Sequence, residues 1–205
     1  MEQKVRELLD ELLQNRGIRP EDIPNIELYM DQVTTFMDEH LSGYKRYPED
    51  KVLTKTMINN YTKNRLLPPS NKKKYSKEHV FLLIMIYYYK SILSISDIQN
   101  LLSTLTDTYF PRNPKNGLSM KEIYSKLMKQ MEDSKPDTEK EILQALEKST
   151  VLFAGEEMDA KEAEDLATFT FMSQLCYDIY LRKQLIEQLL DQMCQPENGK
   201  KKKIK

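Results

Sequence analysis

One stretch of the chain, residues 51–78, carries side chains of the kind that bind nucleic acid. It holds many bases and a single acid, Glu78, although the whole chain of 205 residues has a formal net charge of -1. The bases are Lys51, Lys55, Lys63, Arg65, Lys72, Lys73, Lys74 and Lys77. Clustered cations attract a phosphate backbone, so a basic island in a nearly neutral protein indicates a nucleic-acid-binding surface.

A short helix starting near Thr54 must position part of this island. The Thr54 hydroxyl can accept a hydrogen bond from a free amide of the first turn, and Met57, Ile58 and Tyr61 then recur at helical spacing and should face inward. The opposite arc holds polar and cationic side chains: Thr56, Asn59, Asn60 and Lys63. Asparagine pairs bidentately with adenine in the major groove, and lysine reaches guanine or phosphate. A helix face that is merely solvated has the same composition.

The segment after this helix predicts a hairpin. Pro68 and Pro69 cannot extend the helix, because proline lacks the amide hydrogen and drives the residue before it into extended geometry. Residues 70–72 supply turn formers, residues 73–75 can return as a second strand, and Ser76 is placed to cap the next helix.

This order of elements resembles the winged helix-turn-helix of MerR-type bacterial regulators, whose recognition segment runs roughly V-S-x-x-T-I-R-Y-Y-x-x-x-G-L-L-P-P. The residues in register are Thr54, Ile58, Tyr61, Leu66, Leu67, Pro68 and Pro69, and the family's wing ending R-R-Y-S is similar to residues 73–76. The chain departs from the pattern at Asn59, where the family usually has arginine, at Arg65, which replaces the glycine, and in its shorter wing. Up to about Leu105 the chain is most similar to an uncharacterised bacterial family with a MerR-like domain.

The resemblance implies that the capped helix enters the major groove and that the wing contacts phosphate. It places Asn59 and Asn60 towards the bases and the lysines of residues 72–74 on phosphate. The predicted DNA-binding residues are Lys55, Thr56, Asn59, Asn60, Lys63, Lys72, Lys73 and Lys74.

Composition favours an all-α protein, to which the predicted hairpin adds a small β-wing. The chain has five glycines, no tryptophan and 31% charged residues, which argues against a β-rich fold. The start lacks the apolar stretch of a signal peptide. The longest apolar run, residues 80–89, falls well short of the roughly 20 residues of a membrane span, so we expect no membrane contact and a cytoplasmic location.

The expected organisation places a winged helix-turn-helix domain, with an added N-terminal helix, at residues 1–105. Its parts are helices over residues 2–16 and 26–41, the helix from Thr54, a core helix over 77–90 and a short helix capped by Ser96. The connection over residues 42–53 is much longer than a standard helix-turn-helix turn. A linker over 106–117, a helical dimerisation or sensing region over 118–195 and a basic disordered tail over 196–205 follow.

The longest expected helix, residues 158–193, predicts a homodimer. Its residues 166–181 are apolar nearly all round, which is more surface than one small domain covers. Arg182 and Lys183 interrupt the stripe, so one part of it can pack within the subunit and another between subunits. Acids outnumber bases over residues 132–165, which should keep this half away from DNA.

No catalytic set competes with DNA binding, so we expect no enzyme activity. Phosphate-binding loops, nucleophile motifs and histidine acid-base pairs are missing. Cys176 and Cys194 lie about 27 Å apart on one helix and cannot form a disulfide within the chain. Neither they nor His40 and His79 have metal-site spacing, so no cofactor is expected.

The leading hypothesis is a dimeric DNA-binding transcriptional regulator that binds double-stranded DNA; no small-molecule effector can be named. The main alternative is a helical protein-protein interaction module whose basic island meets an acidic partner. A third alternative is an enzyme of unfamiliar kind with a deep pocket and perturbed carboxylates.

Overall fold

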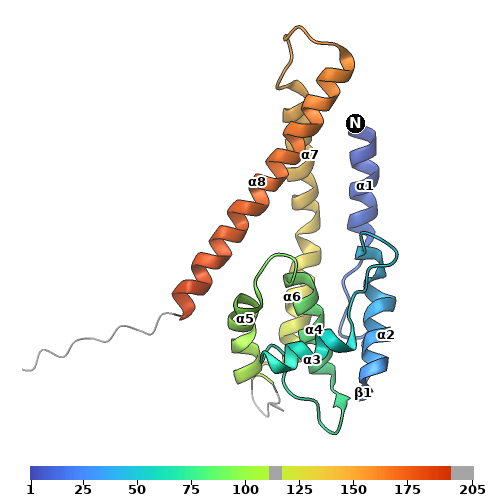
Figure 1. The fold of residues 1–205 in the computed structure, drawn as a ribbon, viewed down its shortest axis with the longest axis vertical. Coiled ribbons are helices and arrows are strands. Elements are labelled where there is room, and N and C mark those ends of the chain that lie inside the picture. The colour runs from blue at the N-terminus through green and yellow to red at the C-terminus, as the bar shows by residue number, and fades with distance from the viewer. Residues whose placement is uncertain (111–116, 195–205) are drawn as a thin grey trace, which may run out of the picture.

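The fold is taken from a computed structural model that describes residues 1–110 and 117–194. Over those residues it is mostly helical with one small two-stranded antiparallel sheet, so the expectation of a helical protein with a minor β element is confirmed (Figure 1). The elements are α1 (Glu2–Gln14), β1 (Leu28–Tyr29), α2 (Met30–Leu41), the 3-10 helix η1 (Ser42–Tyr44), α3 (Lys55–Lys63), β2 (Lys74–Tyr75), α4 (Lys77–Tyr89), α5 (Ile95–Thr108), α6 (Met120–Asp133), α7 (Lys135–Val151) and α8 (Ala160–Cys194).

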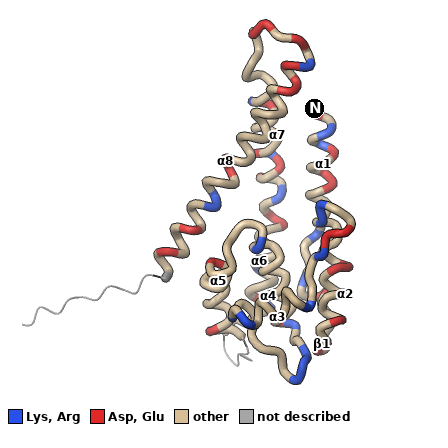
Figure 2. The backbone as a smooth tube through the Cα atoms, viewed as in Figure 1, with Lys and Arg blue, Asp and Glu red and all other residues tan. Residues whose placement is uncertain are grey.

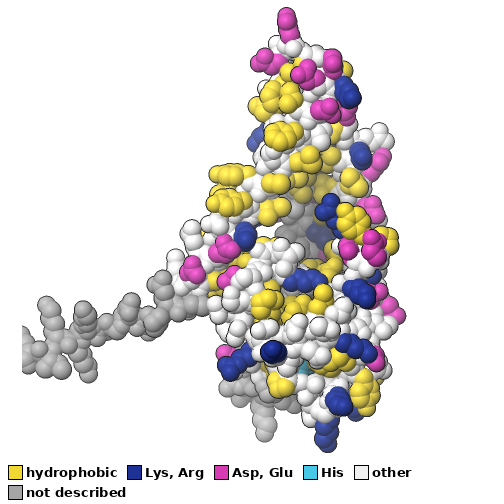
Figure 3. Space-filling model, viewed as in Figure 1, with side chains coloured by type: hydrophobic (Ala, Val, Ile, Leu, Met, Phe, Trp, Pro, Cys, Tyr) yellow, Lys and Arg dark blue, Asp and Glu magenta, His cyan; other side chains and the backbone are white. Residues whose placement is uncertain are grey.

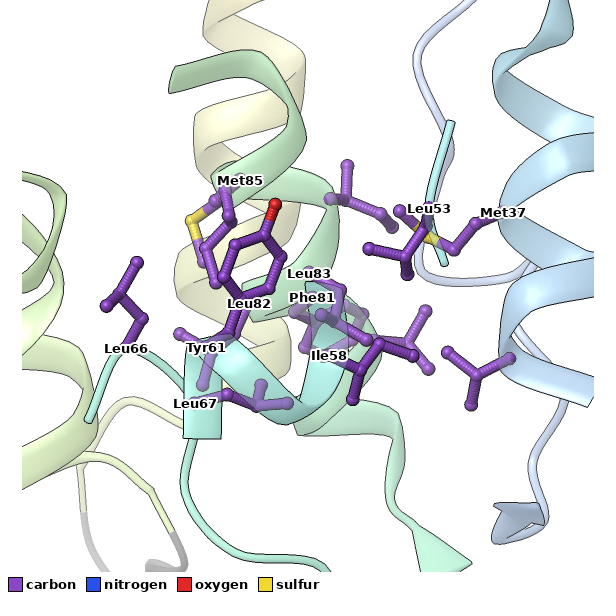
Figure 4. Packing of buried hydrophobic residues seen from close by; sticks show 14 of the residues in the cluster. Met37, Leu53, Ile58, Tyr61, Leu66, Leu67, Phe81, Leu82, Leu83 and Met85 are labelled. Carbon is purple, nitrogen blue, oxygen red and sulfur yellow. The ribbon is translucent and has the colours of Figure 1, made fainter. Parts of the chain in front are cut away.

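Helix α4 is the centre of the main core. Every residue from His79 to Ile86 is buried, as its continuous apolar sequence predicted. In Figure 4, side chains of α4 meet Met37 of α2 and Ile58 and Tyr61 of α3. Each large apolar side chain removed from water in this way contributes about 1.5–3 kcal/mol, and this packing fixes the position of α3.

Helix α6 belongs to the same core, although it follows the predicted linker. Tyr124 stacks on Phe81 with 4.4 Å between ring centroids, and its hydroxyl donates to the carbonyl of Ile18 across 2.7 Å. Elements on both sides of residues 106–117 therefore share one core. Helix α5 occupies the start of the predicted linker, and residues 111–116 lie outside the described part of the chain.

Helix α8 is attached to the rest of the protein near its two ends. Its first half packs on α7, where Phe171 joins a small second core with Leu146. Near its other end, Leu190 is buried in the main core beside α5, and Ile186 packs against that core. Figure 1 shows α8 leaning away from α7 between these points. Despite its length, no helix within the described residues, α8 included, is apolar enough to cross a membrane.

Several predicted boundaries need correction. Residues 28–29 form a strand, so α2 begins at Met30 and not at Ile26. Helix α5 is capped by Ser94, whose hydroxyl accepts from the Asp97 amide across 3.2 Å, and not by Ser96. Helix α7 carries Pro136 in its first turn, where a proline is tolerated. The predicted tail, residues 196–205, lies outside the described residues.

Candidate nucleic-acid interface

Helix α3 starts and packs as its sequence predicted. The Thr54 hydroxyl accepts a hydrogen bond from the Met57 amide across 3.2 Å. Ile58 and Tyr61 are buried, which turns the opposite arc outward. The residues of α3 predicted to bind DNA, Lys55, Thr56, Asn59, Asn60 and Lys63, are all exposed.

The end of α3 forces a cation into an unfavourable backbone conformation. The amide of Leu66 donates to the carbonyl of Tyr61 and the amide of Arg65 to that of Thr62, which is the Schellman pattern of helix termination. This pattern needs a left-handed residue, usually glycine, and Arg65 takes that place with φ 59°. The Arg65 side chain is exposed.

The hairpin after α3 turns through two lysines. Asn71 and Lys74 exchange backbone hydrogen bonds of 3.1 and 2.8 Å, and the residues between them, Lys72 and Lys73, have φ 47° and 64°. Positive φ at both central positions defines a type I′ turn, which favours Asn-Gly. Lys72 and Lys73 are exposed, and Figure 2 shows the basic residues of this hairpin at one end of the molecule.

The strand pairing differs from the predicted hairpin. Strand β2 pairs antiparallel with β1, with Tyr75 opposite Leu28 and Lys74 opposite Tyr29. We expected the returning strand to pair with the outgoing limb of its own hairpin, but the prolines at 68 and 69 offer no amide donors there. The wing is therefore anchored to the segment that precedes α2, and the Lys74 ammonium lies 5.6 Å from the Tyr29 ring centroid.

A buried histidine joins the hairpin to the core. His79 Nδ1 accepts a hydrogen bond from the Ser76 amide across 3.0 Å, in the first turn of α4. Its ring contacts Tyr75 of β2 and Phe110 edge to face. Because an amide can only donate, Nδ1 is unprotonated in this arrangement. Burial lowers the pKa of His79, and the Pro69 carbonyl and Glu78 only partly offset that effect.

The basic side chains of residues 51–78 differ in whether other groups of the protein already bind them. Lys55 forms an ion pair with Asp31 of α2, and Lys77 Nζ donates to the Ile23 carbonyl across 3.0 Å. By contrast, no ion pair within the described residues involves Lys63, Arg65, Lys72 or Lys73. These four exposed side chains give the interface its free positive charge.

The two carboxylates with lowered pKa values, Glu122 and Glu164, owe the shift to contacts that stabilise the structure. The pKa of Glu122 is lowered by hydrogen bonds from the Ser119 amide and hydroxyl in the cap of α6. The pKa of Glu164 is lowered by a hydrogen bond and ion pair with the Met1 ammonium. No group of acids, cysteines and histidines within the described residues could hold a metal ion.

Two features of the interface could not be predicted from the sequence. Arg65 stands where the MerR-type pattern has glycine, but the sequence does not show that its backbone is left-handed or that its side chain is exposed. The turn at Lys72 and Lys73 contains no glycine, so the usual signal for a two-residue hairpin is missing.

Residues 18–127 match the model of a protein family described as a domain of unknown function (DUF1836). The match covers more than half of the 205 residues, so the chain belongs to this family. No curated protein and no solved structure matches the chain. The resemblance to MerR-type regulators therefore depends on the motif residues alone.

Proposed function

We propose that this DUF1836 protein is a transcriptional regulator that binds double-stranded DNA in a winged helix-turn-helix arrangement. Helix α2 is the first helix, α3 enters the major groove, and the hairpin at residues 71–74 is the wing that contacts phosphate. The interface is suited to this role because its exposed face is polar and cationic beside a lysine-bearing turn.

The observation that carries the proposal is the backbone conformation of three cations. Arg65, Lys72 and Lys73 are the non-glycine residues with positive φ in the described part of the chain, and all of them are basic. A left-handed conformation costs a side-chain-bearing residue about 1–2 kcal/mol. Such strain is found where function requires a particular side chain. The property that these three residues share is positive charge. They lie at the end of α3 and at the tip of the wing, where the proposed complex places DNA phosphates.

Asn59 and Asn60 are the residues proposed to read bases. They lie in the middle of the exposed arc of α3, between the cations at its two ends. Asparagine can accept and donate in one plane, which matches the major-groove edge of adenine. Phosphate contacts from Lys63 and the wing would fix the register in which this reading occurs.

The proposed regulator acts as a homodimer through α8. The side chains of Tyr177, Leu181, Leu185 and Leu189 follow at every fourth residue and are 59%, 47%, 58% and 50% exposed. Figure 3 shows hydrophobic side chains along the visible edge of this helix. A monomer rarely exposes so continuous an apolar ridge, and two copies would present two reading helices to successive turns of DNA.

One observation favours the alternative of a protein-protein interaction module. Ile26 and Tyr29, beside the wing, are 66% and 54% exposed. Apolar side chains next to lysines would suit an amphipathic acidic partner as well as a nucleic acid. The dependence of binding on salt and on DNA sequence separates the two functions.

The test is a salt titration of DNA binding with matched variants. Four phosphate contacts per subunit, from Lys63, Arg65, Lys72 and Lys73, predict that log affinity falls with log salt at a slope of about −7 for a dimer. Lys73→Ala should weaken binding to all DNA alike, while Lys140→Ala on the remote helix α7 should not. A binding curve that does not depend on salt would exclude this function.

The base-reading role needs a second comparison. Asn59→Ala or Asn60→Ala should cost about 1–3 kcal/mol on the preferred site and little on random DNA. The preferred site can be obtained by selection from random duplexes with the wild-type protein. Equal losses on both DNAs would show that α3 does not read bases.

A further inference from the structure

An exposed tyrosine lies between the wing and α3. Tyr29 is the second residue of β1, and its side chain is 54% exposed. It stands opposite Lys74 in the antiparallel pair with β2, while the neighbouring pair, Leu28 and Tyr75, is buried. Residues directly opposite each other point to the same face of a sheet, so Tyr29 and Lys74 share the face that is directed away from the core.

The backbone and a lysine hold Tyr29 in place. Its amide donates to Gln32 Oε1 across 2.8 Å, which fixes the residue at the start of α2. The Lys74 ammonium lies 5.6 Å from the ring centroid, a cation–π contact that keeps the ring beside the wing. A tyrosine side chain has few rotatable bonds, so a ring that is held in this way also places its hydroxyl.

The surroundings of Tyr29 are predominantly basic. The wing contributes three lysines at residues 72–74, and Figure 2 shows the basic residues of this hairpin close to β1. Two acids are close to Tyr29 in the sequence. One of them, Asp31, is paired with Lys55 at the start of α3. The other, Glu27, is outnumbered by the wing lysines, so a partner that binds here carries negative charge.

A DNA backbone that meets both α3 and the wing has to pass Tyr29. The ion pair of Asp31 and Lys55 joins the start of α2 to the start of α3, and β1 joins the same end of α2 to the wing. Tyr29 lies between these two connections. The first helix of a helix-turn-helix crosses the DNA backbone and does not enter the groove, and tyrosine is one of the side chains that donate to phosphate oxygens.

We propose that Tyr29 is an uncharged phosphate contact, in which its hydroxyl donates to a phosphate oxygen of the strand that runs from α3 to the wing. The inference rests on the proposed DNA-binding function and adds a contact that the pattern of basic residues does not include. A neutral donor strengthens binding without neutralising a phosphate. Its loss therefore lowers affinity but leaves the dependence of affinity on salt unchanged.

Tyr29→Phe tests the hydroxyl while it keeps the ring and its contact with Lys74. In the full-length protein, affinity should fall about fivefold on the preferred site and on random DNA alike. The salt slope should keep its wild-type value, whereas Lys73→Ala should make it shallower by about 1 per subunit. The helical content and the urea midpoint should not change, because the side chain is exposed.

Tyr47→Phe is the matched control. Tyr47 is 50% exposed, and its ring centroid lies 5.3 Å from the guanidinium carbon of Arg46, so it has the same kind of cation–π contact. It follows the opposite end of α2, away from the wing. Tyr47→Phe should therefore bind DNA as the wild type does.

Ethylation of single phosphates locates the contact on the DNA. Ethylation removes the charge of the phosphate that accepts from Tyr29, so it should weaken the binding of the wild type at that position. Tyr29→Phe makes no hydrogen bond there and should lose less affinity on ethylation of that phosphate, while its losses at the other phosphates should match the wild type. A purely structural role of Tyr29 would leave the pattern of interference unchanged.

Other outcomes overturn the inference in distinguishable ways. If Tyr29→Phe binds as the wild type while Tyr29→Ala is weakened, the ring and not the hydroxyl meets DNA. A shallower salt slope for Tyr29→Phe would mean that the change acts by displacing the wing lysines. If both variants bind as the wild type and the salt slope is about −7, DNA binding stands, and Tyr29 and Ile26 are left for a protein partner. A wild-type curve that does not depend on salt would overturn DNA binding together with this contact.

Discussion

The backbone amide of Leu66 donates to the carbonyl of Tyr61 across 2.9 Å, and both side chains are buried in the main core. This bond closes the end of α3 and directs the chain into the wing. It also holds Arg65, the residue before Leu66, in the left-handed conformation. The hydrogen bond that ends α3 therefore also determines the backbone conformation of the exposed Arg65.

Arg65→Gly should stabilise the protein while weakening DNA binding. Glycine removes the steric cost of positive φ, so we expect the free energy of unfolding in urea to rise by about 1 kcal/mol. Arg65→Ala is the matched control, because it removes the charge and keeps the strained backbone. The two variants should lose DNA affinity equally but differ in stability; equal stability would show that Arg65 is not strained.

Asp31→Asn should strengthen DNA binding. Asp31 forms an ion pair with Lys55 at the start of α3, and both side chains are well exposed. An exposed pair contributes at most about 1 kcal/mol to stability, so the fold should be unaffected. Releasing Lys55 and removing a negative charge should raise affinity severalfold at low salt and steepen the salt slope. Asp38→Asn, on the same helix and paired with Lys45, tests for a general effect of lost negative charge.

Local signals in the sequence were sufficient for most of the helices. The cap at Thr54 and the continuous apolar run of α4 are each contained within one helix, and the structure confirms them. Ser94 and Ser96 offer competing caps two residues apart, and the prediction of Ser96 was wrong because Ser94 is the cap. The burial of Tyr124 against Phe81 depends on contacts between distant segments, which no local pattern reveals.

The sequence was sufficient to predict which side chains form the site, but not the strand pairing and turn conformation of its backbone. The exposure of Asn59 and Asn60 follows from helical periodicity once Ile58 and Tyr61 are assigned to the core. The pairing of β2 with β1 joins residues more than forty positions apart, and strands of two residues give almost no alternation to detect. The left-handed turn at the wing tip lacks the glycine by which such turns are usually recognised.

His79 should make stability depend on pH. Burial lowers its pKa in the folded protein below the ordinary value of about 6.5, so the unfolded chain binds more protons as pH falls below that value. The free energy of unfolding should therefore decrease with falling pH, by at most about 1.4 kcal/mol per pH unit for one proton. Protonation of Nδ1 would also remove the acceptor of the Ser76 amide.

The contribution of His79 is measured as a difference between variants. His79→Gln keeps an acceptor for the Ser76 amide, as in an S-x-x-Q capping box, but cannot titrate. It should flatten the unfolding free energy between about pH 7 and pH 5 relative to the wild type. A slope unchanged in His79→Gln would assign the effect to other groups.

The last prediction concerns neighbouring residues of α8 that face different surroundings. Leu185 is 58% exposed on the ridge, whereas Ile186 packs against the main core. An aspartate at Ile186 would place a charge against the main core and unfold the monomer, so a change at Ile186 cannot test the dimer. Leu185→Asp should leave the helical content and the urea midpoint of the monomer nearly unchanged. Light scattering at tens of micromolar should then report a monomer for Leu185→Asp and a dimer for the wild type, and tight DNA binding should be lost with the dimer. Gln188→Asp adds the same charge at an exposed polar position of the same helix and should remain dimeric. If Leu185→Asp also remains dimeric, the exposed ridge is not the interface between subunits.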